Sequence, residues 1–227
     1  MRNLFVPVVS IVALAGAASA SHVVTHRDTL NIPFSVGSGN SNTNFSISRL
    51  TESNSNVVEL GIKAKERFFG DGNVGGAGDT YVVQPGYSPV SGVNPAPSSY
   101  AWWNFDFSID LGSRTFSDTI VKLTITNTTN AMTMTYDLSA FIISLGGGSL
   151  SVAQDSQNLA FAPFAGDLVF NPNAPGIYLF SLSAETVADG GDPLGSANMT
   201  VQVVPLPTSA GLASISLLAL ASRRRRR

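Results

Sequence analysis

Residues 103–111 read Trp-Asn-Phe-Asp-Phe-Ser-Ile-Asp-Leu, and this stretch decides the class of fold. Every odd position is apolar and every even position is polar. Because successive side chains of a β-strand point to opposite faces, the pattern predicts a strand with one face in a core and the other in water. It is the clearest strand signal in the chain.

The same alternation recurs elsewhere, and no long stripe of 3.6-residue period indicates an extended helix. Further strands are predicted at residues 44–50, 58–65, 120–126, 131–138, 177–184 and 198–204. Within the segment 177–184, we expect Ile177, Leu179 and Leu182 to lie near the core. A short helix is expected near residues 152–159.

Turns rich in glycine, proline, asparagine and aspartate separate these strands. They fall at residues 70–79, 85–86, 94–97, 146–148, 171–176 and 189–193. Many short strands with such turns predict an all-β fold, namely a single antiparallel β-sandwich or jelly-roll-like domain. A closed barrel is the alternative architecture.

The N-terminus has the pattern of a secretory signal peptide. Arg2 gives a basic start, an apolar run follows at residues 4–15, and Ala18 and Ala20 match the small-residue pattern of a cleavage site. We expect signal peptidase to cut after Ala20 once the translocon has exported the chain. An uncleaved membrane anchor is the weaker alternative, because the run is short and Pro7 interrupts it.

The C-terminus carries a second signal. Residues 204–207 read Val-Pro-Leu-Pro, residues 208–222 carry no charge, and five consecutive arginines follow. An uncharged helix of 15 residues rises about 22 Å, against a hydrocarbon core of about 30 Å, so the segment is a marginal span that snorkelling arginines extend. Because positive charge prefers the cytoplasmic side, we expect the body to face outward. The alternative, a terminal amphipathic helix, lacks a charged face.

This arrangement of signal peptide, body, proline motif, apolar segment and arginine cluster resembles the PEP-CTERM exported proteins, which exosortases cleave at the membrane. The usual Pro-Glu-Pro core stands here as a Val-Pro-Leu-Pro variant. The resemblance implies an exosortase as partner, a precursor held in the inner membrane by the C-terminal helix, and a secreted or cell-surface product. The residues that carry it are Val204, Pro205, Leu206, Pro207, Arg223, Arg224, Arg225, Arg226 and Arg227.

The body is similar to that of a group of PEP-CTERM proteins of unknown function. The segments that carry this likeness are 59–67, 70–81, 103–110, 157–161 and 170–178. The likeness supports one domain over residues 21–204, between the signal peptide at 1–20 and the sorting signal at 205–227. It supplies no catalytic residues.

The composition excludes several classes of protein. The chain has 227 residues, of which 44% are hydrophobic and 12% charged, with no cysteine and two histidines. Disulfides and cysteine-ligated metals are therefore impossible, and a histidine-rich metal centre is disfavoured. Arg2 and the five terminal arginines make up six of the 13 basic residues, so the body holds seven basic and 15 acidic residues, a net charge of −8. An acidic exported body disfavours nucleic acid as a partner.

Asp106 and Asp110 are the carboxylates that most invite a catalytic interpretation, since they share one strand face. Glycoside hydrolysis needs two carboxyl groups about 5–9 Å apart, whereas strand positions four residues apart are separated by about 13 Å. We therefore expect a solvated polar face rather than a catalytic pair. His22 and His26 lie so close to the mature start that we expect them to be solvated and outside any Ser-His-Asp triad.

Calcium is the one cofactor that the sequence leaves open. The glycine-rich loop at residues 70–79 holds Asp71, Asn73 and Asp79, whose oxygens are ligands that calcium prefers. The spacing differs from that of an EF-hand, and only one near copy of a calcium-binding nonapeptide occurs, so we expect an ordinary exposed loop.

Trp102 is the candidate for stacking on a sugar ring. Alternation sends Trp102 and Trp103 to opposite faces, so we expect one of them in the core and Trp102 exposed. Asn-X-Ser/Thr sequons occur at Asn44, Asn127 and Asn198, but they carry little weight in a chain with a bacterial sorting signal.

Together these patterns predict a non-catalytic exported surface or extracellular-matrix protein, with no catalytic residue and no resident metal. A module that binds extracellular polysaccharide is the first alternative. A glycan-cleaving enzyme that uses Asp106 is the second.

Overall fold

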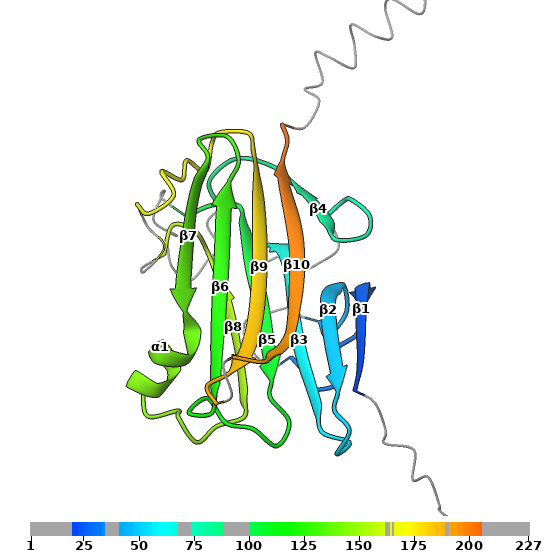
Figure 1. Ribbon diagram of the computed structural model, residues 1–227. Helices are drawn as coiled ribbons and strands as arrows, with labels where there is room; N and C mark the ends of the chain where they lie inside the picture. Colours follow the sequence, from blue (N-terminus) through cyan, green and yellow to red (C-terminus); the bar gives the residue numbers. More distant parts are fainter. Residues whose placement is uncertain are drawn as a thin grey trace, which may run out of the picture.

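Two five-stranded sheets pack face to face in the computed structural model, which describes residues 20–34, 41–67, 74–88, 100–161, 164, 166–188 and 191–205 (Figure 1). The first sheet is antiparallel throughout and has the order β1-β2-β3-β5-β8. Its strands are β1 (Ser21–Asp28), β2 (Phe45–Thr51), β3 (Val57–Glu66), β5 (Trp103–Asp110) and β8 (Val152–Gln157).

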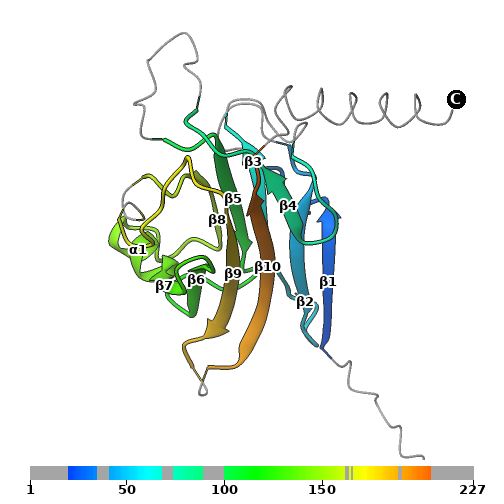
Figure 2. The same ribbon diagram turned by 90° about the horizontal axis from the view of Figure 1, so that it is seen from above.

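The second sheet has the order β4-β10-β9-β6-β7 and is antiparallel except where β4 pairs with β10. Its strands are β4 (Thr80–Val83), β6 (Thr119–Asn127), β7 (Met132–Asp137), β9 (Gly176–Thr186) and β10 (Pro193–Val203). The helix α1 (Leu138–Ser144) lies next to β7 at one side of the sandwich, and β1 lies at the other (Figure 2). These two separate sheets confirm the predicted all-β sandwich.

The core lies between the sheets and is built from alternate residues of their strands. Trp103 at the start of β5 packs edge-on against Phe180 of β9, with ring centroids 6.3 Å apart. The centroid of the Phe105 ring lies 5.0 Å from that of the Phe180 ring. The odd positions of residues 103–111 therefore face the core, as the sequence predicts.

The facing predicted for β9 is wrong in part. Ile177 and Leu179 point away from the core, with 41% and 43% of their surfaces exposed, whereas Tyr178, Phe180 and Leu182 are buried in it. β9 has apolar residues on both faces, so its alternation alone does not define the inner one.

The position predicted for the helix is also wrong. Val152–Gln157 is the edge strand β8, which pairs with β5. The helix instead begins at Leu138, because Asp137 ends β7 and accepts a hydrogen bond of 2.8 Å from the backbone nitrogen of Ala140. The strand predicted at 131–138 thus ends one residue early, and β1 and β4 are strands that the sequence patterns did not predict.

The outer face of the three central strands of the first sheet, β2, β3 and β5, is covered rather than solvated. We call residues 29–34 and 41–44 the crossing segment, because they lie over this face. Leu30 and Phe34 form a second apolar cluster with Phe45 and Ile47 of β2. A Cβ added at Gly61 of β3 would lie 2.6 Å from Leu30 Cδ2 and 3.2 Å from Phe45 Cδ1, so a side chain there would force these buried side chains to shift.

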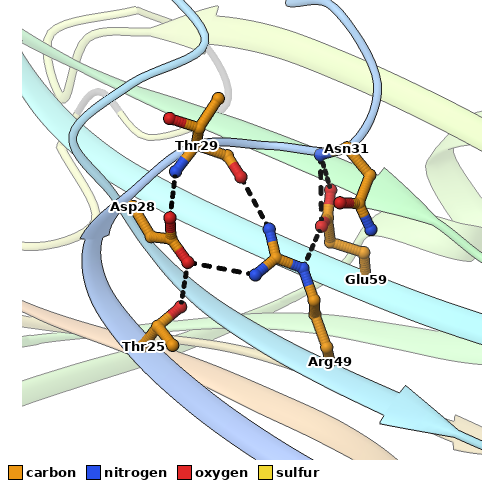
Figure 3. A network of polar contacts seen from close by, with 6 residues as sticks. All are labelled: Thr25, Asp28, Thr29, Asn31, Arg49 and Glu59. Carbon is orange, nitrogen blue, oxygen red and sulfur yellow. Dashed lines mark hydrogen bonds and ion pairs between the residues drawn. The ribbon is translucent and has the colours of Figure 1, made fainter.

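Arg49 of β2 fixes the start of the crossing segment (Figure 3). Its Nε donates to Glu59 Oε2 at 2.6 Å, and another nitrogen of its guanidinium group donates to the backbone oxygen of Thr29 at 2.6 Å. The third contact joins the guanidinium group to Asp28 Oδ2 at 3.1 Å. Glu59 also accepts a hydrogen bond of 2.9 Å from the backbone nitrogen of Asn31.

Candidate functional site

A groove of about 350 Å³ lies at the side of the sandwich where the edge strands β7 and β8 meet α1. Aromatic rings make up much of its wall. Phe107 comes from β5, Tyr136 from β7, Phe141 from α1, and Phe164 from the connection that follows β8. The inward alternation of β7 and the start of α1 immediately after it place Tyr136 and Phe141 in one wall.

Tyr136 is the polar ring of this groove. It packs edge-on against Phe164, with centroids 4.7 Å apart, and its hydroxyl donates to Asp167 Oδ2 at 3.0 Å. Burial, followed by the hydrogen bond to Asp167, raises the pKa of Tyr136 well above its ordinary value. The hydroxyl therefore stays protonated at physiological pH.

Two carboxylates flank the rings, and both have local partners. Asp137 Oδ1 accepts from the backbone nitrogen of Ala140 at 2.8 Å and from the hydroxyl of Ser139 at 2.9 Å. Asp155 accepts from the backbone nitrogen of Ser156 at 2.7 Å and from the side-chain amide of Gln157. Asp137 caps the start of α1, and Asp155 accepts hydrogen bonds from its neighbours within β8.

Flat ring faces beside hydrogen-bonding groups suit a neutral ligand rich in hydroxyls. Phe141 is the accessible ring, since 54% of its surface is exposed, whereas Phe107 and Phe164 are buried. The sequence patterns did not single out this groove. Their one signal for it was the alternation in the predicted strand 131–138, which puts Tyr136 on the same side as Met132 and Met134.

Trp102 does not line this groove. Trp103 is the tryptophan in the core, as predicted, whereas Trp102 is half-buried rather than exposed. The backbone nitrogen of Trp102 donates to Gly86 at 2.9 Å, and its backbone oxygen accepts from Arg67 at 2.8 Å. These contacts tie it to the loops at the end of the sandwich.

Asp106 is fully buried, so the prediction of a solvated polar face is wrong at this position. Its side chain has no exposed surface, and the ammonium groups of Lys63 and Lys65 lie 3.9 and 3.4 Å from its carboxylate oxygens. Asp110 is half-buried and accepts a hydrogen bond of 2.9 Å from the backbone nitrogen of Gly112. The two aspartates share a strand face as predicted, but a substrate has no access to Asp106.

The loop proposed for calcium lies partly outside the described residues, since these exclude Asp71 and Asn73. Asp79 is described, and its Oδ1 accepts from the hydroxyl of Thr80 at 3.3 Å. Within the described part of the chain, no group of three or more acidic or histidine side chains is arranged to hold a metal ion.

The two histidines lie on a paired strand. His22 Nε2 lies 2.8 Å from the hydroxyl of Ser48, and His26 Nδ1 lies 3.4 Å from that of Ser46. Both histidines are exposed on β1, in agreement with the prediction that they are solvated.

The sorting residues fall at the boundary of the described chain. Val204 and Pro205 directly follow β10 and are exposed. Ala20 is the first described residue and is exposed, whereas Ala18, Leu206, Pro207 and the arginine cluster lie outside the described residues. Among the helices in the described ranges, none has the length and apolar character needed to cross a membrane.

Comparison of this chain with known protein families, with characterised proteins and with solved structures found no match.

Proposed function

We propose that this chain is a non-catalytic exported component of the cell surface or extracellular matrix, which an exosortase processes at its C-terminal sorting signal. The observation that supports the proposal is where the last described strand ends. β10 ends at Val203. The Val-Pro-Leu-Pro motif begins at the next residue, and its first two residues, Val204 and Pro205, are exposed. A processing enzyme would therefore meet the first two residues of the motif at the surface, where the backbone nitrogen of Val204 still donates to the backbone oxygen of Val83 in β4 at 2.9 Å.

A structural role fits the chemistry of the candidate side chains. Asp106 is sealed from substrate, and the groove carboxylates Asp137 and Asp155 are engaged by local donors. The translocon, signal peptidase, exosortase and inner membrane are the partners of the precursor in this proposal. The mature body would then be released or displayed outside the cell.

Mass spectrometry of the C-terminal peptide tests the processing step. The full precursor is produced in a host with an exosortase and in the same host without it. We expect the exosortase to remove Arg223–Arg227, and a precursor with Pro205→Ala and Pro207→Ala to retain them. Pro175→Ala, in an exposed turn, is the control that should be processed normally. A mature surface form that keeps the arginines would overturn the proposal.

A second candidate function is binding of extracellular polysaccharide in the aromatic groove. The observation that favours it is the exposed ring of Phe141 beside Tyr136 and hydrogen-bonding groups. A contact between aromatic rings contributes about 0.5–1.5 kcal/mol beyond its buried area. If stacking on a sugar is of similar strength, Phe141→Ala should weaken binding about 2- to 10-fold.

A glycan array, followed by titration of any glycan that binds, measures this effect. Leu145→Ala is the matched control, because Leu145 is 73% exposed at the end of the same helix and does not line the groove. Binding that Phe141→Ala leaves unchanged, or an array without signal above background, would count against this second function.

A further inference from the structure

Three buried ionisable side chains lie close together on the outer face of the first sheet. Lys63 and Lys65 come from β3, and Asp106 comes from the neighbouring strand β5. The exposed fractions of their side chains are 0%, 4% and 0%. Burial of charged groups is costly unless each has a partner, and here two cations share one carboxylate.

Strand pairing brings these groups into contact. Lys63 lies directly opposite Asp106 in the β3–β5 register, and Lys65 lies two residues further along the same face. Lys65 Nζ is 3.4 Å from Asp106 Oδ1, and Lys63 Nζ is 3.9 Å from Oδ2. Neither carboxylate oxygen has a hydrogen bond of normal geometry to a described residue.

Lys63 also contacts the backbone of the crossing segment. Lys63 Nζ donates to the backbone oxygens of Ser41 at 2.8 Å and Thr43 at 3.4 Å, and it lies 4.6 Å from the centre of the Phe45 ring. Carbonyl oxygens and an aromatic face both favour an ammonium ion. Of the two amines, that of Lys65 lies closer to the carboxyl group.

Burial favours the neutral form of Asp106. It raises the pKa of this carboxyl to about 6, against the opposing effects of Lys65, Ser156 and Lys63. A protonated carboxyl group therefore becomes accessible close to neutral pH. A proton that passes from Lys65 to Asp106 would leave the unprotonated amine that must accompany it.

We propose that Lys65 and Asp106 join in an intramolecular amide bond, which links β3 to β5. The amine nitrogen of Lys65 attacks Cγ of the protonated carboxyl group, and an N–Cγ bond forms. Oδ1, which faces Lys65, takes up a proton from the attacking nitrogen and leaves as water when its bond to Cγ breaks. The reaction involves no oxidation or reduction, and its balance is one amine and one carboxylic acid giving one amide and one water.

Lys63 supplies the electrostatic assistance that this step needs. Charge develops on Oδ2 in the tetrahedral intermediate, and the fixed ammonium group of Lys63 lies 3.9 Å from that atom. A preorganised cation in a site closed to water stabilises such a charge. The reaction also replaces two buried ionisable groups by a neutral amide and leaves Lys63 with its carbonyl partners.

Such a bond would give a cysteine-free exported domain a covalent link that disulfides cannot provide. It would lie inside the first sheet and close the stretch of chain between residues 65 and 106. The cross-linked chain has fewer unfolded conformations, so the link favours the folded state.

The mass of the purified full chain tests the proposal, with the ends of the same sample identified from its terminal peptides. We expect the wild-type protein to be lighter than its sequence by one water molecule. After digestion with trypsin, a peptide containing Lys65 should be joined to one containing Asp106, and cleavage after Lys65 should be blocked. A loss of water confined to a single peptide would instead be a cyclised aspartate and would overturn the proposal.

Variants assign the roles of the two lysines. Lys65→Arg and Asp106→Ala should have their full sequence masses, whereas Asp106→Asn should expel ammonia and reach the same final mass as the wild-type product. A cross-link through Lys63 would contradict the assignment to Lys65. Wild-type protein that is folded and has its full sequence mass would overturn the proposal, whatever the stability of the variants.

Discussion

At the residue scale, Arg49 on the outer face of the first sheet holds the start of the crossing segment against the strands. Arg49 binds Asp28, Glu59 and the backbone of Thr29, so one side chain joins β1, β2, β3 and the segment that follows β1. Glu59 is buried, and loss of Arg49 would leave its charge without this guanidinium partner.

Asp28 gives this network a pH dependence. Hydrogen bonds from the backbone of Thr29, then from Thr25 and Arg49, lower the pKa of Asp28 below its ordinary value. Below that ordinary value the unfolded chain binds a proton that the folded chain does not, so the free energy of unfolding rises with pH in this window. The stabilisation by Asp28 is complete above about pH 4 and is lost as the pH falls through the lowered pKa.

Urea unfolding between about pH 2 and pH 5 measures this dependence. We expect a shallower slope of stability against pH in Asp28→Asn than in the wild type. Asp79→Asn is the control and should retain the wild-type slope, since Asp79 lies outside the Arg49 network. Equal slopes in Asp28→Asn and wild type would remove Asp28 from the acid response.

Asp106 shows why alternation alone did not predict its surroundings. The pattern of residues 103–111 placed Asp106 on the outer face, and that facing is correct. Its burial depends on groups that are distant in sequence, such as Lys63 and Lys65 of the neighbouring strand β3. Strand periodicity describes which face a side chain occupies, but it carries no information on what covers that face.

At the element scale, α1 depends on its first residues. It is a single short helix at the edge of the sandwich, and Asp137 satisfies the backbone nitrogen of Ala140 at its start. The hydroxyl of Ser139 links the same turn to β6, since it accepts from the backbone nitrogen of Val121 at 2.8 Å. The helix and the wall of the aromatic groove are therefore ordered together.

Asp137→Ala should destabilise the protein by about 0.5–2 kcal/mol, because it leaves a helix-start nitrogen without its cap. Asp137→Asn keeps an acceptor oxygen and should cost only a small part of this. Chemical denaturation of the three proteins provides the comparison, and an alanine variant as stable as the wild type would show that water replaces the cap. If the groove binds glycan, the alanine variant should also bind more weakly.

The errors at this scale have local causes. Asp137-Leu138-Ser139 holds a capping aspartate that signals the helix, but the inward residues Met132, Met134 and Tyr136 continue a strand pattern up to it. Residues 152–157 are polar enough to suggest an exposed helix, whereas they form an edge strand whose partner is distant in sequence. The facing of β9 was ambiguous because both of its faces are apolar.

At the scale of the whole molecule, the two sheets share one apolar core. Trp103 of the first sheet contacts Phe180 of the second, and Phe105 contacts the same ring. Neither sheet can separate without exposing these large side chains to water. The sandwich should therefore unfold as one cooperative unit.

Coincident unfolding curves from tryptophan fluorescence and far-ultraviolet circular dichroism would bear this out. Trp102→Phe makes the test sharper, because the remaining fluorescence then reports on the buried Trp103 alone. Two separate transitions would show that the sheets unfold independently.

The all-β class and several strands were predictable from local alternation, whereas the aromatic groove was not. Its wall combines Phe107, Tyr136, Asp155 and Phe164, which lie on four segments of the chain. Their proximity depends on the order of strands in two sheets, and short-range patterns do not encode that order. Trp102 was a reasonable candidate from composition, but the loops at the end of the sandwich partly cover it.

The beginning of β1 and the end of β10 lie at opposite ends of the sandwich (Figure 1). A force that pulls these two strand ends apart would act along the strands. It would shear the rows of hydrogen bonds between neighbouring strands, so that many hydrogen bonds resist it at once instead of breaking one after another. β10 is held on both sides, by β9 along its length and by β4 near its end. The molecule should therefore extend little under tension, because β10, the strand nearest the C-terminus, is hydrogen-bonded to a strand on each side.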